Sequence, residues 1–289
     1  MNPTVYWSVR RELWENRFLY IAPLLVAAVV LFATFISSFG LPKRMRALPT
    51  IEPARQHAVV VRPFSMAPAP IMLATFLVGF FYSLDALYGE RRDRSILFWK
   101  SLPVSDLTTV LSKASIPMVV LPLIAFVLSV ATFFILFLQS TVVLLAAGVS
   151  PARLWVELPF VQEPMVMLYG LTVHSLWFAP IYAWLVLISA WARRSPFLWA
   201  LLPLLAVAAV ERIVFNTTLF MSMLQYRIGG AMREAFAINP QHGGNGVLDQ
   251  ITQLTPARFL TSPGLWVGLV FAAAFLTAAV RLRRNREPI

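Results

Sequence analysis

The residues whose types and spacing most suggest a function lie in one short segment, residues 89–106. Five charged side chains are followed there by an apolar and aromatic cluster: Glu90, Arg91, Arg92, Asp93 and Arg94, then Ile96, Leu97, Phe98 and Trp99. Arg and Trp are enriched among the residues that dominate binding at protein interfaces. The pattern therefore favours docking of another protein. The alternative is a helix at the membrane surface, with its aromatic rings at headgroup level and its arginines on phosphates.

Four other ionisable residues lie in or beside apolar runs, where polar groups are costly and are candidates for function: Asp85, His174, Glu211 and Arg212. We expect Asp85 to pair with Arg91 or Arg92 and so to orient the charged segment. We expect His174 to be a hydrogen-bonded packing residue rather than a proton relay. Glu211 is expected to pair with Arg212 rather than to bind substrate.

Catalytic and metal-binding patterns are missing from the sequence. The three histidines, at positions 57, 174 and 242, make no H-E-x-x-H motif, and the absence of cysteine excludes thiolate ligands, cysteine nucleophiles and disulfides. The sequence also lacks the phosphate loop G-x-x-x-x-G-K-[ST]. We therefore expect no catalytic residue, metal or cofactor in this chain, and an intramembrane enzyme is the least favoured function.

Long apolar stretches must position these residues. Roughly 20 apolar residues span the ~30 Å hydrocarbon core of a bilayer, and the sequence has six uncharged runs of suitable composition: 18–39, 63–84, 114–152, 165–192, 195–210 and 259–280. The chain is 59% hydrophobic and 13% charged, with a mean hydropathy of +0.73. Continuous apolar runs favour helices over barrel strands. The prediction is an all-α integral membrane protein with six transmembrane helices.

The remaining segments are assigned around these spans. Residues 1–17 are predicted to form an amphipathic elbow helix in the membrane interface, and residues 18–289 a single six-helix domain. The first span is too long for a cleaved signal sequence and should be retained. Pro117 and Pro122 predict a kink in the third span. The longest outer segment, residues 217–262, is predicted to contain a helix over 218–236, and the basic tail after Val280 to anchor at lipid headgroups.

Charge distribution indicates partners and orientation. The net charge of +11 is scattered over the loops, which favours membrane lipids over nucleic acid as the anionic partner. With both termini in the cytoplasm, 14 of the 24 basic residues fall on the cytoplasmic side. The basic, proline-rich first outer loop, residues 42–62, opposes this orientation.

The charged segment, the following Leu102-Pro103-Val104-Ser105 and Lys113 in the next helix resemble the cytoplasmic coupling loop of type-2 ATP-binding-cassette (ABC) exporter permeases. This resemblance implies a bacterial inner-membrane permease subunit that pairs with a second permease subunit, by default another copy of itself. Two separate ABC ATPase subunits would bind ATP and Mg²⁺ and contact residues 90–99. The implied substrate is amphipathic: a lipid, a peptide or a drug. A non-transporting membrane anchor or sensor that recruits an ATPase is the alternative.

Overall fold

The computed structural model describes residues 3–95, 104–237 and 251–285. Helices dominate these residues, which contain no β-strand, only an isolated bridge between Phe236 and Leu254. Six helical stretches are long and apolar enough to cross a membrane: Phe18–Ser38, Val59–Arg92, Asp106–Ala146, Gln162–Trp191, Pro196–Phe215 and Pro263–Asn285. The predicted all-α, six-span architecture is confirmed.

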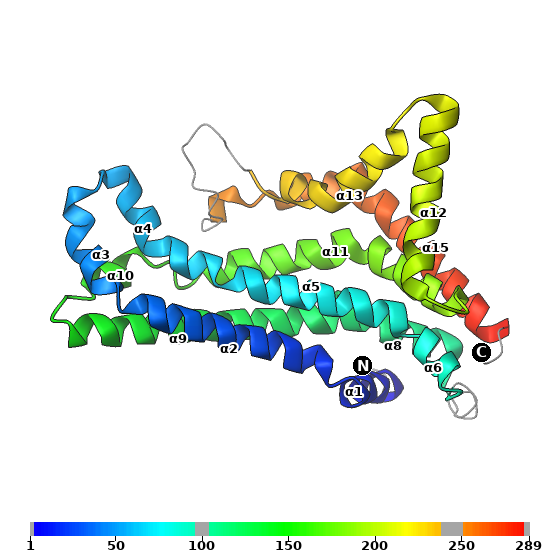
Figure 1. Cartoon of the computed structure of the whole chain (residues 1–289), viewed down its shortest axis with the longest axis horizontal. Helices are drawn as coiled ribbons and strands as arrows, with labels where there is room; N and C mark the ends of the chain where they lie inside the picture. Colours follow the sequence, from blue (N-terminus) through cyan, green and yellow to red (C-terminus); the bar gives the residue numbers. More distant parts are fainter. Residues whose placement is uncertain (1–2, 96–103, 238–250, 286–289) are drawn as a thin grey trace.

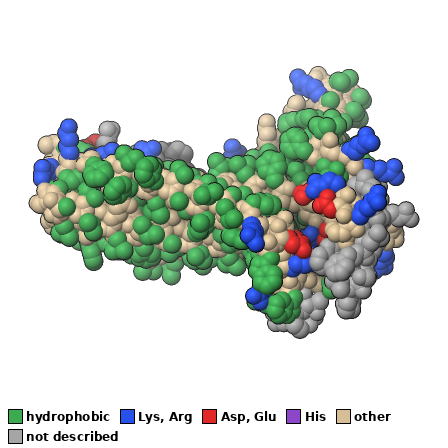
Figure 2. All heavy atoms as spheres, turned by 60° about the horizontal axis from the view of Figure 1, so that its bottom comes forward, with side chains coloured by type: hydrophobic (Ala, Val, Ile, Leu, Met, Phe, Trp, Pro, Cys, Tyr) green, Lys and Arg blue, Asp and Glu red, His purple; other side chains and the backbone are tan. Residues whose placement is uncertain are grey.

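The spans form an elongated bundle (Figure 1). Its body consists of α2 (Phe18–Ser38), α5 (Pro68–Asp85), α9 (Leu121–Ala146) and α11 (Gln162–Trp191), and α15 (Pro263–Asn285) packs along α11. Helix α1 (Pro3–Glu15) lies at the same end of the bundle as the last turn of α15. We call this the terminal end and the opposite one the distal end. In Figure 2, hydrophobic side chains cover the elongated body and charged ones gather near its ends.

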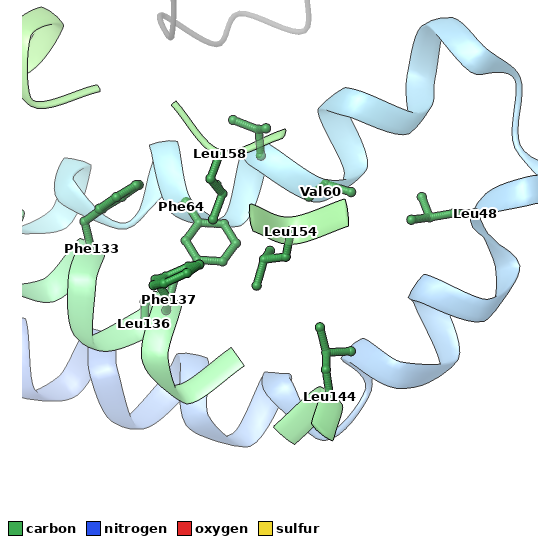
Figure 3. Close-up of a cluster of buried hydrophobic side chains, with 10 residues drawn as sticks. Leu48, Val60, Phe64, Phe133, Leu136, Phe137, Leu144, Leu154 and Leu158 are labelled. Atoms are coloured by element: carbon green, nitrogen blue, oxygen red, sulfur yellow. The ribbon is translucent and has the colours of Figure 1, made fainter. Parts of the chain in front are cut away.

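The distal end is helical where the sequence analysis placed a proline-rich loop. It contains α3 (Leu41–Ala47), η1 (Leu48–Thr50), α4 (Pro53–Met66) and α10 (Ala152–Glu157). Pro42, Pro49 and Pro53 each lie at the start of a helix, where a backbone N–H has no helical partner to lose. Apolar side chains from α4, α9 and α10 fill a core between these helices (Figure 3).

The third span is irregular where its prolines lie. It runs through α8 (Asp106–Ser115), a π-helical turn η2 (Ile116–Val120) and α9. Pro117 lies in the π turn, which accommodates a residue that has no N–H to donate to the preceding turn. Helix α9 ends at Ala146 and is followed by Gly148, whose φ of 66° is readily adopted by glycine, and Val149 donates its N–H to the carbonyl of Leu144.

The fifth span leaves the bundle. Helix α12 (Pro196–Val210) and the turn η3 (Glu211–Phe215) lie between two residues with left-handed backbone, Ser195 and Asn216. Ala200 is the one buried residue of α12. In Figure 1, α12 runs away from the elongated body of the bundle. The chain returns through α13 (Leu219–Ala235), close to the predicted helix over 218–236, and α14 (Pro256–Thr261).

Small residues allow the last helix to approach its neighbours closely. Gly264, Gly268 and Ala272 repeat every four residues on α15, a spacing that favours tight packing between membrane helices. Ala272 packs against α11, and the side chain of Arg227 from α13 fills the space beside Gly268. The Arg227 guanidinium donates to the carbonyls of Trp177 and Gly264, at 3.1 and 2.8 Å, and lies over the Trp177 ring.

Candidate functional site at the terminal end

The charged segment begins as a short helix, α6 (Tyr88–Arg92), which packs against the end of α5. Arg92, Asp93 and Arg94 are exposed. The Arg92 guanidinium lies 3.5 Å from the carboxylate of Asp85 and 3.0 Å from that of Asp93. The predicted pairing of Asp85 is therefore confirmed with Arg92. Ile96, Leu97, Phe98 and Trp99 lie outside the described residues.

Glu90 and Arg91 differ from the expectation that all five charged side chains face a partner. Both are buried in the protein, at 8% and 3% exposure. Arg91 donates to the carbonyls of Ala190 and Ala192, where α11 ends and its last carbonyls need donors. The amide of Leu87 donates to the Ser189 hydroxyl at 3.2 Å. These bonds fix the base of the segment against α11.

Glu90 belongs to a group of ionic side chains that joins four helices. We call it the charge cluster: Arg11 and Glu12 from α1, Glu90 from α6, Asp106 and Lys113 from α8, and Arg283 from α15. Three of these side chains are acidic and three are basic. Each buried charge of the cluster therefore has an opposite charge beside it, as buried ionic groups require, and the half-exposed Glu15 also lies 3.6 Å from Arg11.

Lys113 connects the first helix to the charged segment. Its ammonium lies 2.9 Å from Glu12 and 3.3 Å from Glu90, and its side chain is 5% exposed. Glu12 also accepts hydrogen bonds from the Tyr82 hydroxyl, at 2.7 Å, and from Arg11, at 2.8 Å. Burial alone would raise the pKa of Glu12, but the Lys113 charge and these hydrogen bonds hold that pKa below its ordinary value.

Arg283 connects the last helix to the same cluster. Its guanidinium donates to Glu90, at 3.2 Å, and to Asp106. The prediction of a headgroup anchor is wrong for this residue, which is only 4% exposed. The Ser105 hydroxyl accepts the amide of Thr108 and so caps the start of α8, which leaves Asp106 to pair with Arg283.

The sequence alone does not identify the charge cluster as a site. Its weak signals were Glu12 on the polar side of the first helix, and Lys113 and Arg283 at the ends of apolar runs. A charged residue at any of these positions would equally be expected on a solvated surface or in contact with lipid headgroups. Only the packing of α1, α8 and α15 around α6 brings them together.

His174 lies on α11, away from the charge cluster. Its Nε2 is 3.0 Å from the Tyr182 hydroxyl, and its ring packs against Phe178 and Phe76, with centroids 4.8 and 5.8 Å away. It is a hydrogen-bonded packing residue, as expected, and it also lines a cavity of about 420 Å³.

Contrary to the prediction, Glu211 does not pair with Arg212. Its carboxylate accepts the Thr217 hydroxyl at 2.7 Å and the amides of Leu219 and Phe220 at 2.6 and 2.9 Å. Those amides begin α13 and have no helical acceptor of their own. Glu211 therefore holds the start of α13 against the end of the fifth span.

In the described ranges, no three His, Asp or Glu side chains come together as metal ligands. Comparison of the chain with models of protein families, with curated proteins and with solved structures gives no match.

Proposed function

We propose that this chain is the membrane-spanning permease subunit of an ABC exporter in a bacterial inner membrane, with both termini in the cytoplasm. A separate ABC ATPase, present in two copies, supplies the energy. The permease works as a pair, by default of two identical chains, and moves an amphipathic substrate. These assignments rest on the resemblance of residues 89–106 to a coupling loop and on the anchoring of that segment.

One observation carries the proposal: the charged segment has an exposed part and a buried part. Arg92, Asp93 and Arg94 present charge outward, while Glu90 and Arg91 are held inside by α8, α11 and α15. A force applied to the exposed side would therefore act on several spans together. A helix that merely rests on lipid headgroups would not need its base fixed to the bundle.

The exposed fifth span is consistent with pairing of two permeases. Its large side chains, among them Leu198, Leu202 and Leu205, are more than half exposed. Such a surface must face lipid or another membrane subunit, so it provides area for a second copy without disturbing the bundle.

The test is recovery of the ATPase by affinity purification. The tagged chain, purified from its native membrane, is expected to bring down a phosphate-loop ATPase identified by mass spectrometry. The double variant Arg92→Glu with Trp99→Ala should recover much less of it at equal membrane expression. Arg281→Glu is the matched control, because Arg281 is exposed near the same end but lies on α15. Equal recovery by all three proteins would refute the proposal.

Transport itself needs a second measurement. In proteoliposomes containing the recovered ATPase, substrate should stimulate ATP hydrolysis by the wild type and not by the double variant. ATPase binding without any stimulation by a broad set of amphipathic compounds would instead support the anchor or sensor.

A further inference from the structure

The cavity beside His174 has walls from four parts of the chain and is lined mainly by apolar side chains. Helix α11 supplies one wall, α5 and the π turn with the start of α9 supply two more, and α13 covers the remaining side. Its volume of about 420 Å³ is in the range of sites for small organic molecules, roughly 300–1,000 Å³. The cavity is therefore large enough for a ligand, and its polar groups decide which kind of ligand fits.

One pair of side chains, His174 and Tyr182, offers hydrogen bonds to the cavity. The His174 Nε2 and the Tyr182 hydroxyl lie 3.0 Å apart, and both residues line it. The hydroxyls of Ser65 and Thr75 also line it, but they donate to carbonyls of their own helices. Glu163 is a further lining residue that already has a partner within the protein. In the described lining, the pair is therefore the position that best suits the polar group of a ligand.

The pair keeps hydrogen-bonding capacity after its own contact is made. Among the described residues, the Tyr182 hydroxyl is the one hydrogen-bond partner of the His174 ring. A neutral imidazole has one donor and one acceptor, and a phenol hydroxyl can donate one hydrogen bond and accept another. Their mutual bond uses one donor and one acceptor, so one of each is left whichever tautomer is present. A ligand hydroxyl, which also donates and accepts, matches both.

Charged groups fit this end of the cavity poorly. Neither Lys nor Arg contributes to the lining that the structure describes, so a carboxylate or phosphate would be buried there without a counter-charge. An ammonium has three donors and no acceptor, whereas the pair leaves a single acceptor. The Phe76 and Phe178 rings pack against His174, with centroids 5.8 and 4.8 Å from its own. Aromatic faces also attract cations, so an amine is the competitor that an experiment must exclude.

The Tyr182 ring is fixed by close packing against the third span. A Cβ added to Gly79 of α5 would lie 3.3 Å from side-chain atoms of Pro117 and Leu121 and 3.4 Å from the Tyr182 ring. The glycine therefore lets α5, the π turn and α11 approach one another closely. Pro117 of the π turn also lines the cavity, and π turns within α-helices are frequent at functional sites.

We propose that this cavity, within a single copy of the chain, binds a neutral lipid alcohol: a largely apolar molecule with one hydroxyl group. The hydroxyl bonds to His174 and Tyr182. The apolar body lies along α11 toward Met167, which packs with Met72 of α5, and the flexible methionine side chains adapt to its shape. This site is separate from the charge cluster and does not depend on the proposed function.

Gly170 provides a way to close the cavity without removing a polar group. It lines the wall four residues before His174, where the apolar body would lie, and a Cβ added there would meet only Phe236, at an ordinary distance of 3.7 Å. Gly170→Ala should therefore be tolerated, while the longer side chain of Gly170→Leu would occupy ligand space. Both replacements favour the helix over glycine.

The experiment uses photolabelling of the purified full chain in nanodiscs. The probe is dodecanol with a diazirine in its alkyl chain, and the competitors are dodecanol, dodecane, dodecylamine and dodecanoate. They are compared at equal concentration in the lipid and at about pH 9, where the amine is protonated and the carboxylate ionised. The probe should label cavity-lining peptides saturably. Dodecanol should compete about fivefold more tightly than dodecane, the ratio expected for one net neutral hydrogen bond, and more tightly than either charged compound.

Two sets of variants separate the cavity from its polar pair. Gly170→Leu should abolish saturable labelling and Gly170→Ala should retain it. The double variant His174→Leu with Tyr182→Phe should retain saturable labelling but lose the preference for dodecanol over dodecane. Labelling that is not saturable, or that persists in Gly170→Leu, would overturn the site. A preference for dodecanol that persists in the double variant would overturn the assignment to this pair.

The wild type alone tests the chemical class of the ligand. Equal competition by dodecanol and dodecane would overturn the bonding of a hydroxyl. Competition by dodecylamine or dodecanoate as tight as that by dodecanol would overturn the preference for a neutral molecule. Both comparisons hold even if a variant fails to fold.

Discussion

The Lys113 ammonium lies 2.9 Å from the carboxylate of Glu12, although 101 residues separate them in the chain. Both side chains are almost completely buried. The pair connects the first helix to the start of the third span, and Lys113 also contacts Glu90 of the charged segment. Its energetics can be tested without knowledge of any partner.

Removing one member of the pair should destabilise the protein strongly. Lys113→Met keeps most of the side-chain volume but leaves Glu12 buried without its main counter-charge, which costs about 3–5 kcal/mol. The free energy of unfolding in detergent is the measurement. Lys43→Met is the matched control, because Lys43 is exposed at the distal end, and it should change stability by less than about 0.5 kcal/mol.

The double variant Glu12→Gln with Lys113→Met completes a double-mutant cycle. It should be more stable than the sum of the two single losses predicts, because no charge of this pair is then left unmatched. Additive losses would contradict direct coupling of Glu12 and Lys113.

Acid should weaken the same contact in a defined direction. The pKa of Glu12 lies below its ordinary value of 4.5, so the folded protein binds this proton more weakly than the unfolded chain does. The stabilisation is therefore fully present above pH 4.5 and is lost as the pH falls through the lowered pKa. Between pH 7 and pH 3, the thermal unfolding midpoint of the wild type should fall more than that of Glu12→Gln. Parallel curves would refute this assignment.

Gly268 should not tolerate a side chain. A Cβ at this position would collide with the Arg227 guanidinium, which would have to leave the carbonyl of Gly264. Gly268→Leu is expected to lower the free energy of unfolding by about 1–3 kcal/mol through overpacking. Gly229→Leu is the control, because a Cβ at Gly229 meets no atom within 4 Å. A loss of the same size in both variants would mean that helix packing is not the cause.

The cysteine-free sequence allows the topology to be read directly. The two test variants are Asp93→Cys and Val156→Cys. Asp93 lies in the charged segment at the terminal end, and Val156, which is 84% exposed, lies in α10 at the distal end. An impermeant thiol reagent should label position 93 from the cytoplasm and position 156 from outside. Labelling of both positions from one face would overturn the six-span orientation.

The spans could be predicted from sequence because an apolar run of about 20 residues is stable as a helix in the hydrocarbon core of a membrane. The helix of α13 was also found within one residue at each end, from its apolar pattern and the breakers that follow it. Tertiary partners were harder to predict. Arg283 looked like a headgroup anchor, yet it is buried because α6 and α8 offer it Glu90 and Asp106. Glu211 has an Arg beside it in sequence, but its carboxylate accepts the Thr217 hydroxyl and two amides at the start of α13 instead.

Arg283 has a consequence for the order in which the protein is made. Its acceptors are synthesised long before it, since 193 residues separate it from Glu90 and 177 from Asp106. Until the last span has entered the membrane, both carboxylates lack this counter-charge, and among the described side chains Glu90 has only Lys113 and Arg11 beside it. The charge cluster is therefore completed only after α15 has inserted, because Arg283 is the last of its six side chains to be synthesised.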